Sequence, residues 1–381
     1  MRIVKLGDLV TVMNEREDNP SQSKYDHFVG LEHYDSGSVS ITRWGSTEML
    51  VSAMKVFHRG DILVARRNVY LKRASTVDFD GITSGDSIIL RVNDERYKAI
   101  VPFVLNTDSF WDYADQHSDG SMSKRLAPKT MLEYEFTLPD DEEVERLSTL
   151  LWAMERTKTA YKNLIAKTDE LVKSQFVEMF GTFPANEHGW PVGTIRDGVM
   201  DVRYGSSRKA AEGNNGQYPY LRMNNITYGG ELDLTDVKTI NIPDDELDKC
   251  SVRRGDVLFN RTNSRELVGK TCVYNRDEIM VLAGFVVRVR VNDRLLPEFL
   301  SAFMNTDFTK TLLLSMCKAA IGQANINATE FQNIGIYFPP IEHQQEFVQI
   351  KAQADKSKFA AQQALADLTA TQKVLMRQYL G

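Results

Sequence analysis

Two segments decide the fold of this chain: PDDEEVERLSTLLWAMERTKTAYKNLIAKTDELVKSQFVEMFG at Pro139–Gly181 and PPIEHQQEFVQIKAQADKSKFAAQQALADLTATQKVLMRQYLG at Pro339–Gly381. They align without a gap at an offset of 200 residues. Apolar residues recur in both at alternating steps of three and four, which predicts a heptad seam along a long helix. The seam residues are Val144, Leu147, Leu151, Met154, Tyr161, Ile165 and Val172, then Phe347, Ala354, Ala361, Leu365, Leu368, Leu375 and Tyr379, with polar interruptions at Lys158, Thr168, Lys351, Lys358 and Gln372.

The ends of these segments carry the signals of helix termini. Pro139 and the Pro339-Pro340 pair lie where a helix begins, and Gly181 and Gly381 lie where one ends. A helix of about 40 residues is roughly 60 Å long at 1.5 Å per residue, too long for one small domain to bury. We therefore expect the two seams to pack against each other as an antiparallel coiled coil.

The segments before the helices repeat as well. Gly60-Asp61-Ile62-Leu63 corresponds to Gly255-Asp256-Val257-Leu258, and Asn106-Thr107-Asp108 corresponds to Asn305-Thr306-Asp307. A repeat this long is not a solenoid unit. The predicted fold class is α+β: two similar β-rich domains at residues 1–138 and 183–338, and two long antiparallel helices at 139–182 and 339–381, with pseudo-twofold symmetry.

Within the globular segments, short Val-, Ile- and Leu-rich runs broken by Gly, Asp, Asn and Ser predict strands. Two segments with helical spacing, Ile100–Tyr113 and Pro297–Lys318, predict helices. The predicted strands are Ile62–Ala65, Ser87–Val92, Met131–Leu138, Tyr218–Met223, Asp256–Asn260 and Val281–Val291.

The composition is that of an ordinary globular protein, with 26% charged and 42% hydrophobic residues and a net charge of −6. The first residues lack the apolar core of a signal peptide, and no apolar run approaches the roughly 20 residues that cross a bilayer. The three cysteines, Cys250, Cys272 and Cys317, form no metal or disulfide pattern. We expect a cytoplasmic protein.

Sequence signals of catalysis are weak. Gly269-Lys270-Thr271 resembles the end of a phosphate-binding loop, but Ser264 stands where that loop needs its first glycine. The six histidines show no metal-ligand spacing. We therefore expect no catalytic residue and no metal ligand. Two similar domains without chemistry of their own suggest a subunit that directs the active site of another protein.

Basic residues occupy corresponding places in the two halves despite the acidic average. Residues 50–75 hold six of them with one acid, Asp61. Residues 251–270 hold five with Asp256 and Glu266. In each half the basic residues lie on both sides of the Gly-Asp motif, and a basic loop follows the strand after it. The basic residues are Lys55, Arg59, Arg66, Arg67, Lys72 and Arg73, and then Arg253, Arg254, Arg261, Arg265 and Lys270.

The chain resembles the DNA-specificity (S) subunit of Type I restriction-modification systems, a host-defence family. The resemblance covers essentially the whole chain and rests on the two-copy layout and the repeated Gly-Asp motif. It also rests on Tyr220-Leu221-Arg222-Met223-Asn224-Asn225-Ile226, on Ile321-Gly322-Gln323-Ala324-Asn325-Ile326 and on Phe338-Pro339-Pro340-Ile341-Glu342-His343-Gln344-Gln345. The first half departs from the pattern, with Ser121-Met122-Ser123-Lys124-Arg125-Leu126 in place of the Gly322–Ile326 stretch.

The resemblance implies a non-catalytic subunit in which each globular domain, a target-recognition domain, reads one half of a split DNA site. The helices would fix the gap between half-sites. Family members assemble with two copies of a DNA adenine methyltransferase subunit and with a restriction-translocase subunit. Those partners, not this chain, would bring S-adenosylmethionine, ATP and Mg.

Phosphate contacts need Lys or Arg, and base edges are read by Arg, Asn, Gln or Ser. The loops after the repeated strands are the leading candidates, with Ser123 and Lys124 taken as counterparts of Gln323 and Asn325. The candidate DNA-binding residues are Arg66, Arg67, Asn68, Lys72, Arg73, Ser123, Lys124, Arg203, Tyr204, Arg208, Lys209, Arg222, Asn224, Arg261, Asn263, Arg265, Gln323 and Asn325. For each one, the alternative is an ordinary solvated or turn residue.

Four apolar side chains of the first long helix lie off the seam and suggest a docking surface for partner subunits: Leu150, Leu164, Leu171 and Phe176. The alternative is that the helices only tie the two domains together. Two other functional classes remain open from the sequence, a self-contained DNA methyltransferase or nuclease with degenerate motifs, and a coiled-coil adaptor that binds proteins.

Overall fold

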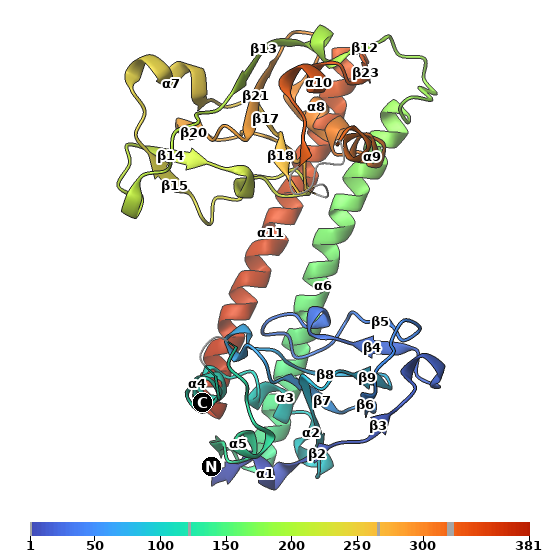
Figure 1. Ribbon diagram of the computed structural model, residues 1–381, viewed down its shortest axis with the longest axis vertical. Helices are drawn as coiled ribbons and strands as arrows, with labels where there is room; N and C mark the ends of the chain where they lie inside the picture. The colour runs from blue at the N-terminus through green and yellow to red at the C-terminus, as the bar shows by residue number, and fades with distance from the viewer. Residues whose placement is uncertain (1, 121–122, 265–266, 318–323) are drawn as a thin grey trace. The chain divides into compact units, whose positions relative to one another are not determined.

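The computed structural model describes residues 2–120, 123–264, 267–317 and 324–381 (Figure 1). The chain divides into two compact units, and the division falls inside both long helices. Unit 1 comprises Met1–Asn163 and Ala361–Gly381, and unit 2 comprises Leu164–Ala360. Each unit thus combines one of the two predicted globular segments with parts of both helices. The mixed α+β class predicted from the sequence is confirmed.

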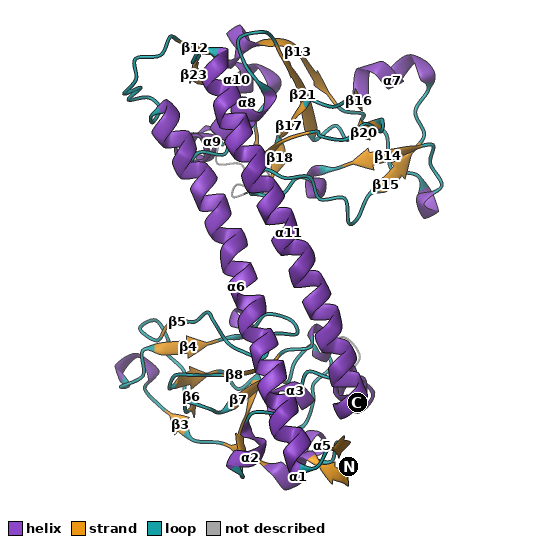
Figure 2. Ribbon diagram, turned by 180° about the vertical axis from the view of Figure 1, so that it is seen from behind, coloured by secondary structure: helices purple, strands orange, loops and turns teal. Residues whose placement is uncertain are grey.

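The two long helices have the predicted positions and equal length. Helix α6 runs over Asp141–Phe180 and helix α11 over Ile341–Leu380, 40 residues each (Figure 2). Asp140 caps the start of α6 through its side chain, which accepts from the Glu143 N–H over 3.1 Å. Gly181 follows α6 with a φ of +79°, a conformation that glycine adopts without strain.

The described residues of unit 1 form short strands and helices besides the parts of the long helices. The strands are β1 (Arg2–Lys5), β2 (Val10–Met13), β3 (Arg16–Glu17), β4 (His27–Val29), β5 (Gly45–Ser46), β6 (Met54–Phe57), β7 (Ile62–Ala65), β8 (Ala74–Thr76), β9 (Gly81–Thr83), β10 (Ser87–Val92) and β11 (Glu135–Leu138). The helices are α1 (Leu6–Leu9), α2 (Glu95–Lys98), α3 (Val101–Val104), α4 (Asp108–Gln116) and α5 (Pro128–Leu132), with 3-10 turns η1 (Pro20–Gln22), η2 (Leu31–His33) and η3 (Val69–Leu71).

Unit 2 follows the same plan. Its strands are β12 (Val192–Thr194), β13 (Val199–Tyr204), β14 (Tyr218–Leu221), β15 (Lys238–Ile240), β16 (Ser251–Val252), β17 (Val257–Asn260), β18 (Thr262–Asn263), β19 (Thr271–Val273), β20 (Met280–Leu282), β21 (Val286–Val291), β22 (Ala324–Asn325) and β23 (Gly335–Tyr337). Its helices are α7 (Asp244–Cys250), α8 (Pro297–Met304), α9 (Asp307–Met316) and α10 (Ala328–Gln332), with 3-10 turns η4 (Ile195–Gly198), η5 (Glu212–Asn214) and η6 (Met223–Asn225).

Sheet topology shows that the units are copies of one fold. The order β2-β10-β7-β8 in unit 1 corresponds to β13-β21-β17-β19 in unit 2, and the pair β1-β11 corresponds to β12-β23. A second sheet contains β5-β4-β9-β6 in unit 1 and β15-β14-β20-β16 in unit 2. Each second sheet has one parallel pair among antiparallel neighbours, β4 with β9 and β14 with β20. The sequence repeat therefore extends to topology and strand direction.

Within each unit the parts of α6 and α11 pack antiparallel, as predicted. In unit 1 the Lys158 ammonium donates to the Gln372 side chain over 2.8 Å, at the predicted polar positions of the seam. Val144, Leu147, Leu151 and Met154 of α6 join the core of unit 1, and Met376 and Leu380 of α11 join the same core. In unit 2, by contrast, the seam is closed by aromatic rings, Phe176 and Phe180 of α6 against Phe347 of α11.

Several predicted element boundaries are wrong. The Met131–Leu138 strand begins only at Glu135, because α5 occupies the residues up to Leu132. The predicted strand Val281–Val291 is two strands, separated by a turn in which the Val286 N–H donates to the Ala283 carbonyl over 2.9 Å.

The predicted helices Ile100–Tyr113 and Pro297–Lys318 are each two helices, and the position of Lys318 lies outside the described residues. The break falls at the repeated Asn-Thr-Asp motif in both units. Thr107 and Thr306 each cap a new helix by accepting from a backbone N–H three residues on.

Candidate nucleic-acid interface

Arg66 lies directly after the buried strand β7, and two loops hold its backbone. Its N–H donates to the Asp86 carbonyl over 2.9 Å, and its carbonyl accepts from the Leu126 N–H over 2.9 Å. The first contact comes from the turn before β10 and the second from the segment before α5. The sequence placed Arg66 in a basic loop, and the structure brings two distant segments to that loop.

Arg261 is held in the same way after β17 in unit 2. Its N–H donates to the Phe285 carbonyl over 3.0 Å, and its carbonyl accepts from the Ile326 N–H over 2.9 Å. The side-chain Nε of Arg261, like that of Arg66, is buried without a hydrogen-bond acceptor among the described residues. The two arginines therefore occupy one and the same backbone position in the two copies.

A buried ion pair fixes the turn at the other end of each strand. In unit 1 the Asp61 carboxylate accepts from the Arg91 guanidinium over 2.8 and 2.9 Å and from the His58 N–H over 2.8 Å. In unit 2 Asp256 accepts from Arg290 over 2.8 and 3.3 Å and from the N–H of the residue equivalent to His58 over 2.9 Å. The hydrogen bond to the aspartate raises the pKa of each arginine. The repeated Gly-Asp motif is therefore structural.

In unit 1 the loop presents a charged group. Arg67 and Arg125 pair across an isolated antiparallel bridge. The Asp86 carboxylate lies between their guanidinium groups, 3.6 Å from each. We call Arg66, Arg67, Asp86 and Arg125 the unit 1 patch. Lys55 lies nearby, and its pKa is lowered by burial and then by the positive charges of Arg66 and Arg16.

In unit 2 the same backbone presents a different set of side chains. The Arg261 guanidinium lies over the ring of Tyr204, 4.7 Å from its centroid. The positions that hold Arg67 and Arg125 in unit 1 are here Thr262 and Asn325, which pair between β18 and β22 and share a 3.0 Å side-chain hydrogen bond. Phe285 takes the place of Asp86. We call Tyr204, Arg261, Thr262, Phe285 and Asn325 the unit 2 patch.

Other predicted residues lie near these patches. Asn68 donates from its N–H to the Lys124 carbonyl over 3.0 Å and accepts from the Ser123 hydroxyl over 3.3 Å. Lys124 itself pairs with Asp115 at 2.8 Å. In unit 2 Asn263 follows Thr262 on β18 and caps the next residue through its side chain.

A further group of predicted residues is engaged elsewhere in internal ion pairs. Arg203 pairs with Asp201 and Asp248, Arg208 pairs with Glu246, Arg222 pairs with Asp236, and Lys72 pairs with Asp108. Lys209 is exposed on a loop, and Asn224 is exposed in the 3-10 turn η6. Among the described residues, by contrast, no carboxylate lies within ion-pair distance of Arg66 or Arg261, so these two keep their charge available for an external anion.

Two site predictions are wrong because the side chains are buried. Arg73 is only 8% exposed, and its guanidinium donates to the carbonyls of Leu31 and Arg67, so it supports the loop from inside. Phe176 is 2% exposed within the core of unit 2 and offers no surface to a partner. Arg265 and Gln323, two further candidates, lie outside the described residues.

Arg125 was missed by the sequence analysis. It is the true counterpart of Asn325, since Leu126 and Ile326 make the same hydrogen bond next to them. The 200-residue offset of the helices also links these two positions, and that offset was the signal that could have identified Arg125. The predicted pairing of Lys124 with Asn325 is therefore shifted by one residue.

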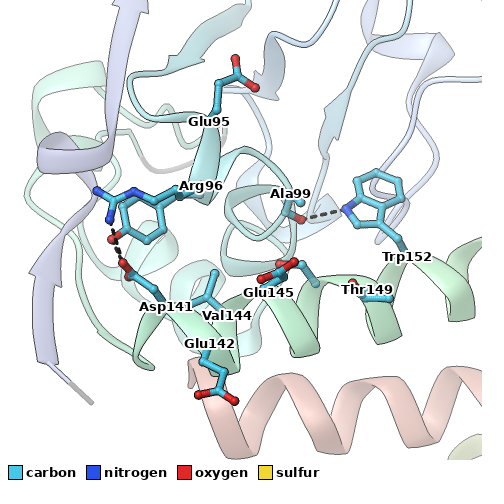
Figure 3. A pocket seen from close by; sticks show the side chains of 11 residues that line it. Glu95, Arg96, Ala99, Asp141, Glu142, Val144, Glu145, Thr149 and Trp152 are labelled. Carbon is cyan, nitrogen blue, oxygen red and sulfur yellow. Dashed lines mark hydrogen bonds and ion pairs between the residues drawn. The ribbon is translucent and has the colours of Figure 1, made fainter.

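The remaining docking candidates, Leu150, Leu164 and Leu171, are exposed on α6. In unit 1 a pocket of about 550 Å³ opens between α2 and the first turns of α6 (Figure 3). Arg96 pairs with Asp141 at 2.7 Å at one end, and the Trp152 indole donates to the Ala99 carbonyl over 2.8 Å at the other. The carboxylates that line the pocket are Glu95, Asp141, Glu142 and Glu145.

Within the described ranges, no group of three or more His, Cys, Asp or Glu side chains has the arrangement of a metal site. In those same ranges, none of the helices combines the length and the apolar composition that crossing a bilayer requires.

The two units share one backbone arrangement and carry different side chains at the patches. Comparisons with known proteins point to the same kind of protein. Residues 188–367 match the family model described as Type I restriction modification DNA specificity domain. Over these residues the chain is similar to that DNA specificity domain. The resemblance to Type I specificity subunits that the sequence indicates is thereby confirmed.

Two curated relatives are named as specificity subunits of type I restriction enzymes, one of them as putative. The EcoKI specificity subunit of Escherichia coli (strain K12), a Type I restriction enzyme subunit, is 24% identical over 253 residues, which cover 62% of this chain and 54% of the relative. The putative MjaX specificity subunit of Methanocaldococcus jannaschii is 27% identical over 169 residues, covering 44% of this chain and 39% of the relative. The chain thus spans about half or less of the length of these curated relatives.

Solved structures support the fold over the whole chain. The Type I restriction-modification S subunit from M. genitalium matches with a TM-score of 0.58 and 12% identity, covering 100% of this chain and 96% of that one. A chain from a study of assembly and conformational transition of the type I R-M system matches with a TM-score of 0.55 and 20% identity, covering 99% and 97%. At these identities the likeness shows the fold alone.

Proposed function

We propose that this chain is a non-catalytic specificity subunit that binds a bipartite, gapped DNA sequence. Unit 1 reads one half-site through the unit 1 patch, and unit 2 reads the other through the unit 2 patch. The subunit recruits two copies of a DNA adenine methyltransferase subunit and a restriction-translocase subunit. Those partners supply S-adenosylmethionine, ATP and Mg, and this chain supplies the sequence preference.

One observation carries the proposal. Arg66 and Arg261 follow equivalent strands, and their backbones bond to two equivalent segments. In both, the side-chain Nε is buried without a hydrogen-bond acceptor among the described residues, while the surrounding side chains differ. A protein that reads two different sequences with one fold needs this combination, because a common frame positions the contacts and distinct side chains distinguish the bases. A protein-binding adaptor has no need of matched arginines free of carboxylate partners.

The recruitment part rests on α6. Leu150, Leu164 and Leu171 expose apolar surface on a helix whose seam is already occupied by α11. Exposed apolar side chains on a helix face indicate a surface that another chain covers. Retained assembly with the methyltransferase subunits in a Leu164→Asp variant would remove this part of the proposal and leave DNA reading intact.

Mapping methylated adenines in the host genome tests the proposal. We expect a two-part motif with a fixed gap. Exchanging residues 1–138 for those of another specificity subunit should change one half of the motif, and exchanging residues 183–338 should change the other half. The proposal fails if the motif is continuous, or if either exchange alters both halves. Methyl transfer by the purified chain alone would favour a self-contained enzyme instead.

A further inference from the structure

Phe285 is a large apolar side chain in an exposed turn. It is 51% exposed and belongs to none of the hydrophobic clusters of the described residues. Its backbone is fixed, since its carbonyl accepts from the Arg261 N–H and the turn is closed between Val286 and Ala283. The fold uses the backbone of Phe285 and leaves its ring unburied beside the proposed DNA-contacting arginine.

Unit 1 has the same turn with a different side chain. Asp86 lies at the position of Phe285: its carbonyl accepts from the Arg66 N–H, and the turn closes from Ser87 to Ser84 over 3.1 Å. Here the side chain is a partly exposed carboxylate that lies 3.6 Å from each of two guanidinium groups. One turn, held by one set of backbone hydrogen bonds, therefore carries a ring in unit 2 and a charged group in unit 1.

These side chains match different base edges in the major groove. A guanidinium donates to O6 and N7 of guanine, and a carboxylate accepts from the N4 amino group of cytosine. A phenylalanine ring contacts the methyl group of thymine, and an asparagine amide pairs with N6 and N7 of adenine. The unit 1 patch thus presents both complements of a G·C pair. The unit 2 patch presents, in Phe285 and Asn325, both complements of an A·T pair.

We propose that the side chain of this turn sets the base preference of each unit, so that Phe285 reads a thymine through its methyl group and Asp86, with Arg67 and Arg125, reads a G·C pair. This inference rests on the proposed function and adds to it the residue that distinguishes the half-sites. The patch arginines Arg66 and Arg261 are common to both units and do not distinguish them. The half-sites are distinguished by the side chain of the turn and by the bridge-paired residues next to it. These are Arg67 with Arg125 in unit 1 and Thr262 with Asn325 in unit 2.

The first experiment changes the DNA and leaves the protein untouched. The full chain, assembled with methyltransferase subunits, selects its bipartite site from a randomised duplex library. Each thymine of the unit 2 half-site is then replaced in turn by deoxyuridine, which lacks only the methyl group. We expect one replacement to weaken binding roughly three- to five-fold, the effect of one methyl group leaving apolar contact. At the position that the unit 1 turn contacts we expect a G·C pair, and therefore no thymine to replace.

The second experiment links that methyl group to Phe285. Phe285→Ala should bind the selected site as weakly as wild type binds the deoxyuridine site. Replacing the thymine by deoxyuridine should then cause no further loss of affinity in the variant. Ile279→Ala is the matched control, because Ile279 is equally exposed in unit 2 and lies before the other end of β20. The control should keep the full deoxyuridine effect.

The third experiment exchanges the two turns. Phe285→Asp should move the selected base pair in the unit 2 half-site from A·T toward G·C, and Asp86→Phe should do the reverse in the unit 1 half-site. Phe285 is exposed, and Asp86 is partly exposed and paired with arginines, so neither exchange removes core packing.

The outcomes separate the two proposals. If deoxyuridine weakens binding to a bipartite site equally in wild type and in Phe285→Ala, this inference is overturned and the proposed function stands. Exchanges that leave both half-sites unchanged overturn it as well. Absence of any sequence-selective binding by the wild-type assembly overturns the proposed function together with the inference.

Discussion

The unit 1 patch has two arginines paired with one carboxylate beside a third arginine, whereas the unit 2 patch combines one arginine with two aromatic rings, a hydroxyl and an amide. Behind the patches the two units agree almost contact by contact. The Asp61–Arg91 pair has its equivalent in Asp256–Arg290, with the same Nε to Oδ1 distance of 2.8 Å. Around these arginines the divergence lies in the side chains of the patches, while the network that positions them is unchanged. This is the distribution expected where one scaffold serves two sequences.

A second comparison shows that not every difference lies at the surface. Counting from the repeated Asn-Thr-Asp motif, Lys310 on α9 stands where unit 1 has Trp111 on α4. Trp111 is buried in its core, whereas the Lys310 ammonium donates to the Gly269 carbonyl and lies 4.9 Å from the Tyr228 ring centroid. Burial, then the charges of Lys173 and Lys270, lower the pKa of Lys310 to about 8.

The largest expected effect concerns the helix parts that close each core. Phe176 and Met376 are equivalent positions of α6 and α11, buried in unit 2 and unit 1 respectively. Phe176→Asp should destabilise unit 2 by on the order of 5 kcal/mol or more, because it removes a core ring and buries a carboxylate without a partner. Met376→Asp should destabilise unit 1 by less, since a flexible side chain near the end of α11 is replaced. Denaturant unfolding measures both.

Leu171→Asp is the control for Phe176→Asp, since Leu171 lies on the same helix but is exposed. It should leave the unfolding free energy within about 0.5 kcal/mol of wild type. Under the proposed function it should still impair assembly with the methyltransferase subunits. A Phe176→Asp variant with the unfolding free energy of wild type would contradict the packing of Phe176 in the core of unit 2.

The next effect tests the shared buried ion pair. Asp256→Ala leaves Arg290, whose side chain is only 18% exposed, without its carboxylate, and about 3–5 kcal/mol of stability should be lost. Asp61→Ala leaves Arg91, which is 43% exposed and can turn to water, so the loss should be smaller, about 1–3 kcal/mol. Equal losses in the two variants would contradict the argument from exposure. Thermal unfolding of each variant beside wild type gives the comparison.

Much of the scaffold was predictable from the sequence because the repeat contains residues with strong local conformational preferences. Proline, glycine and a three–four apolar spacing located both long helices to within two residues at each end. The Gly-Asp motif located β7 and β17 for the same reason. Gly60 and Gly255 adopt φ values of +90° and +89°, and the aspartate that follows each one is buried and paired with an arginine.

The site was less predictable because it depends on contacts between segments far apart in the chain. Nothing in the sequence near Arg261 indicates that the backbone of Phe285 holds it, or that Asn325 pairs with Thr262. Charge alone was misleading at Arg73, where a basic residue in a basic loop turns inward and donates to main-chain carbonyls. Phe176 misled for the opposite reason: it lies off the heptad seam but faces the core of unit 2.

The pH dependence of stability should differ between the units because of Lys310. The folded pKa of about 8 lies below the usual value of 10.5, so between these values the unfolded chain keeps a proton that the folded chain has lost. Stability linked to this group therefore rises with pH from about 8 to 10.5. At pH 7 Lys310→Met should stabilise the protein by about 2 kcal/mol, since no charge has to be desolvated.

Raising the pH to 10 should remove most of the advantage of Lys310→Met, because the wild-type lysine is then neutral in the folded state. Denaturant unfolding at pH 7 and pH 10 gives the two differences. Lys249→Met, at an exposed position of α7, is the control and should show a difference that does not change with pH. A stabilisation by Lys310→Met that is equal at both pH values would argue against a desolvated ammonium in unit 2.

The smallest expected change is in the free energy of DNA binding, and it tests sequence recognition most directly. Arg66→Ala or Arg261→Ala should weaken DNA binding by the assembled complex by roughly 1–3 kcal/mol where the guanidinium contacts a base. A contact to phosphate should appear instead as a shallower dependence of binding on salt. Arg59→Ala and Arg254→Ala are matched controls, because these arginines precede the Gly-Asp turns at the opposite ends of β7 and β17. They should leave affinity and salt slope unchanged.

The pattern across the four variants decides what the common backbone position does. If Arg66 and Arg261 contact the same kind of group, their variants should change affinity and salt slope in the same proportion, although the bases recognised differ. That outcome would place sequence preference in the side chains that differ between the patches. If the two variants behave differently, for instance one by salt slope and the other by base preference, then the stacking of Arg261 on Tyr204, which Arg66 lacks, has redirected the guanidinium. If neither variant differs from its control, these loops do not contact DNA.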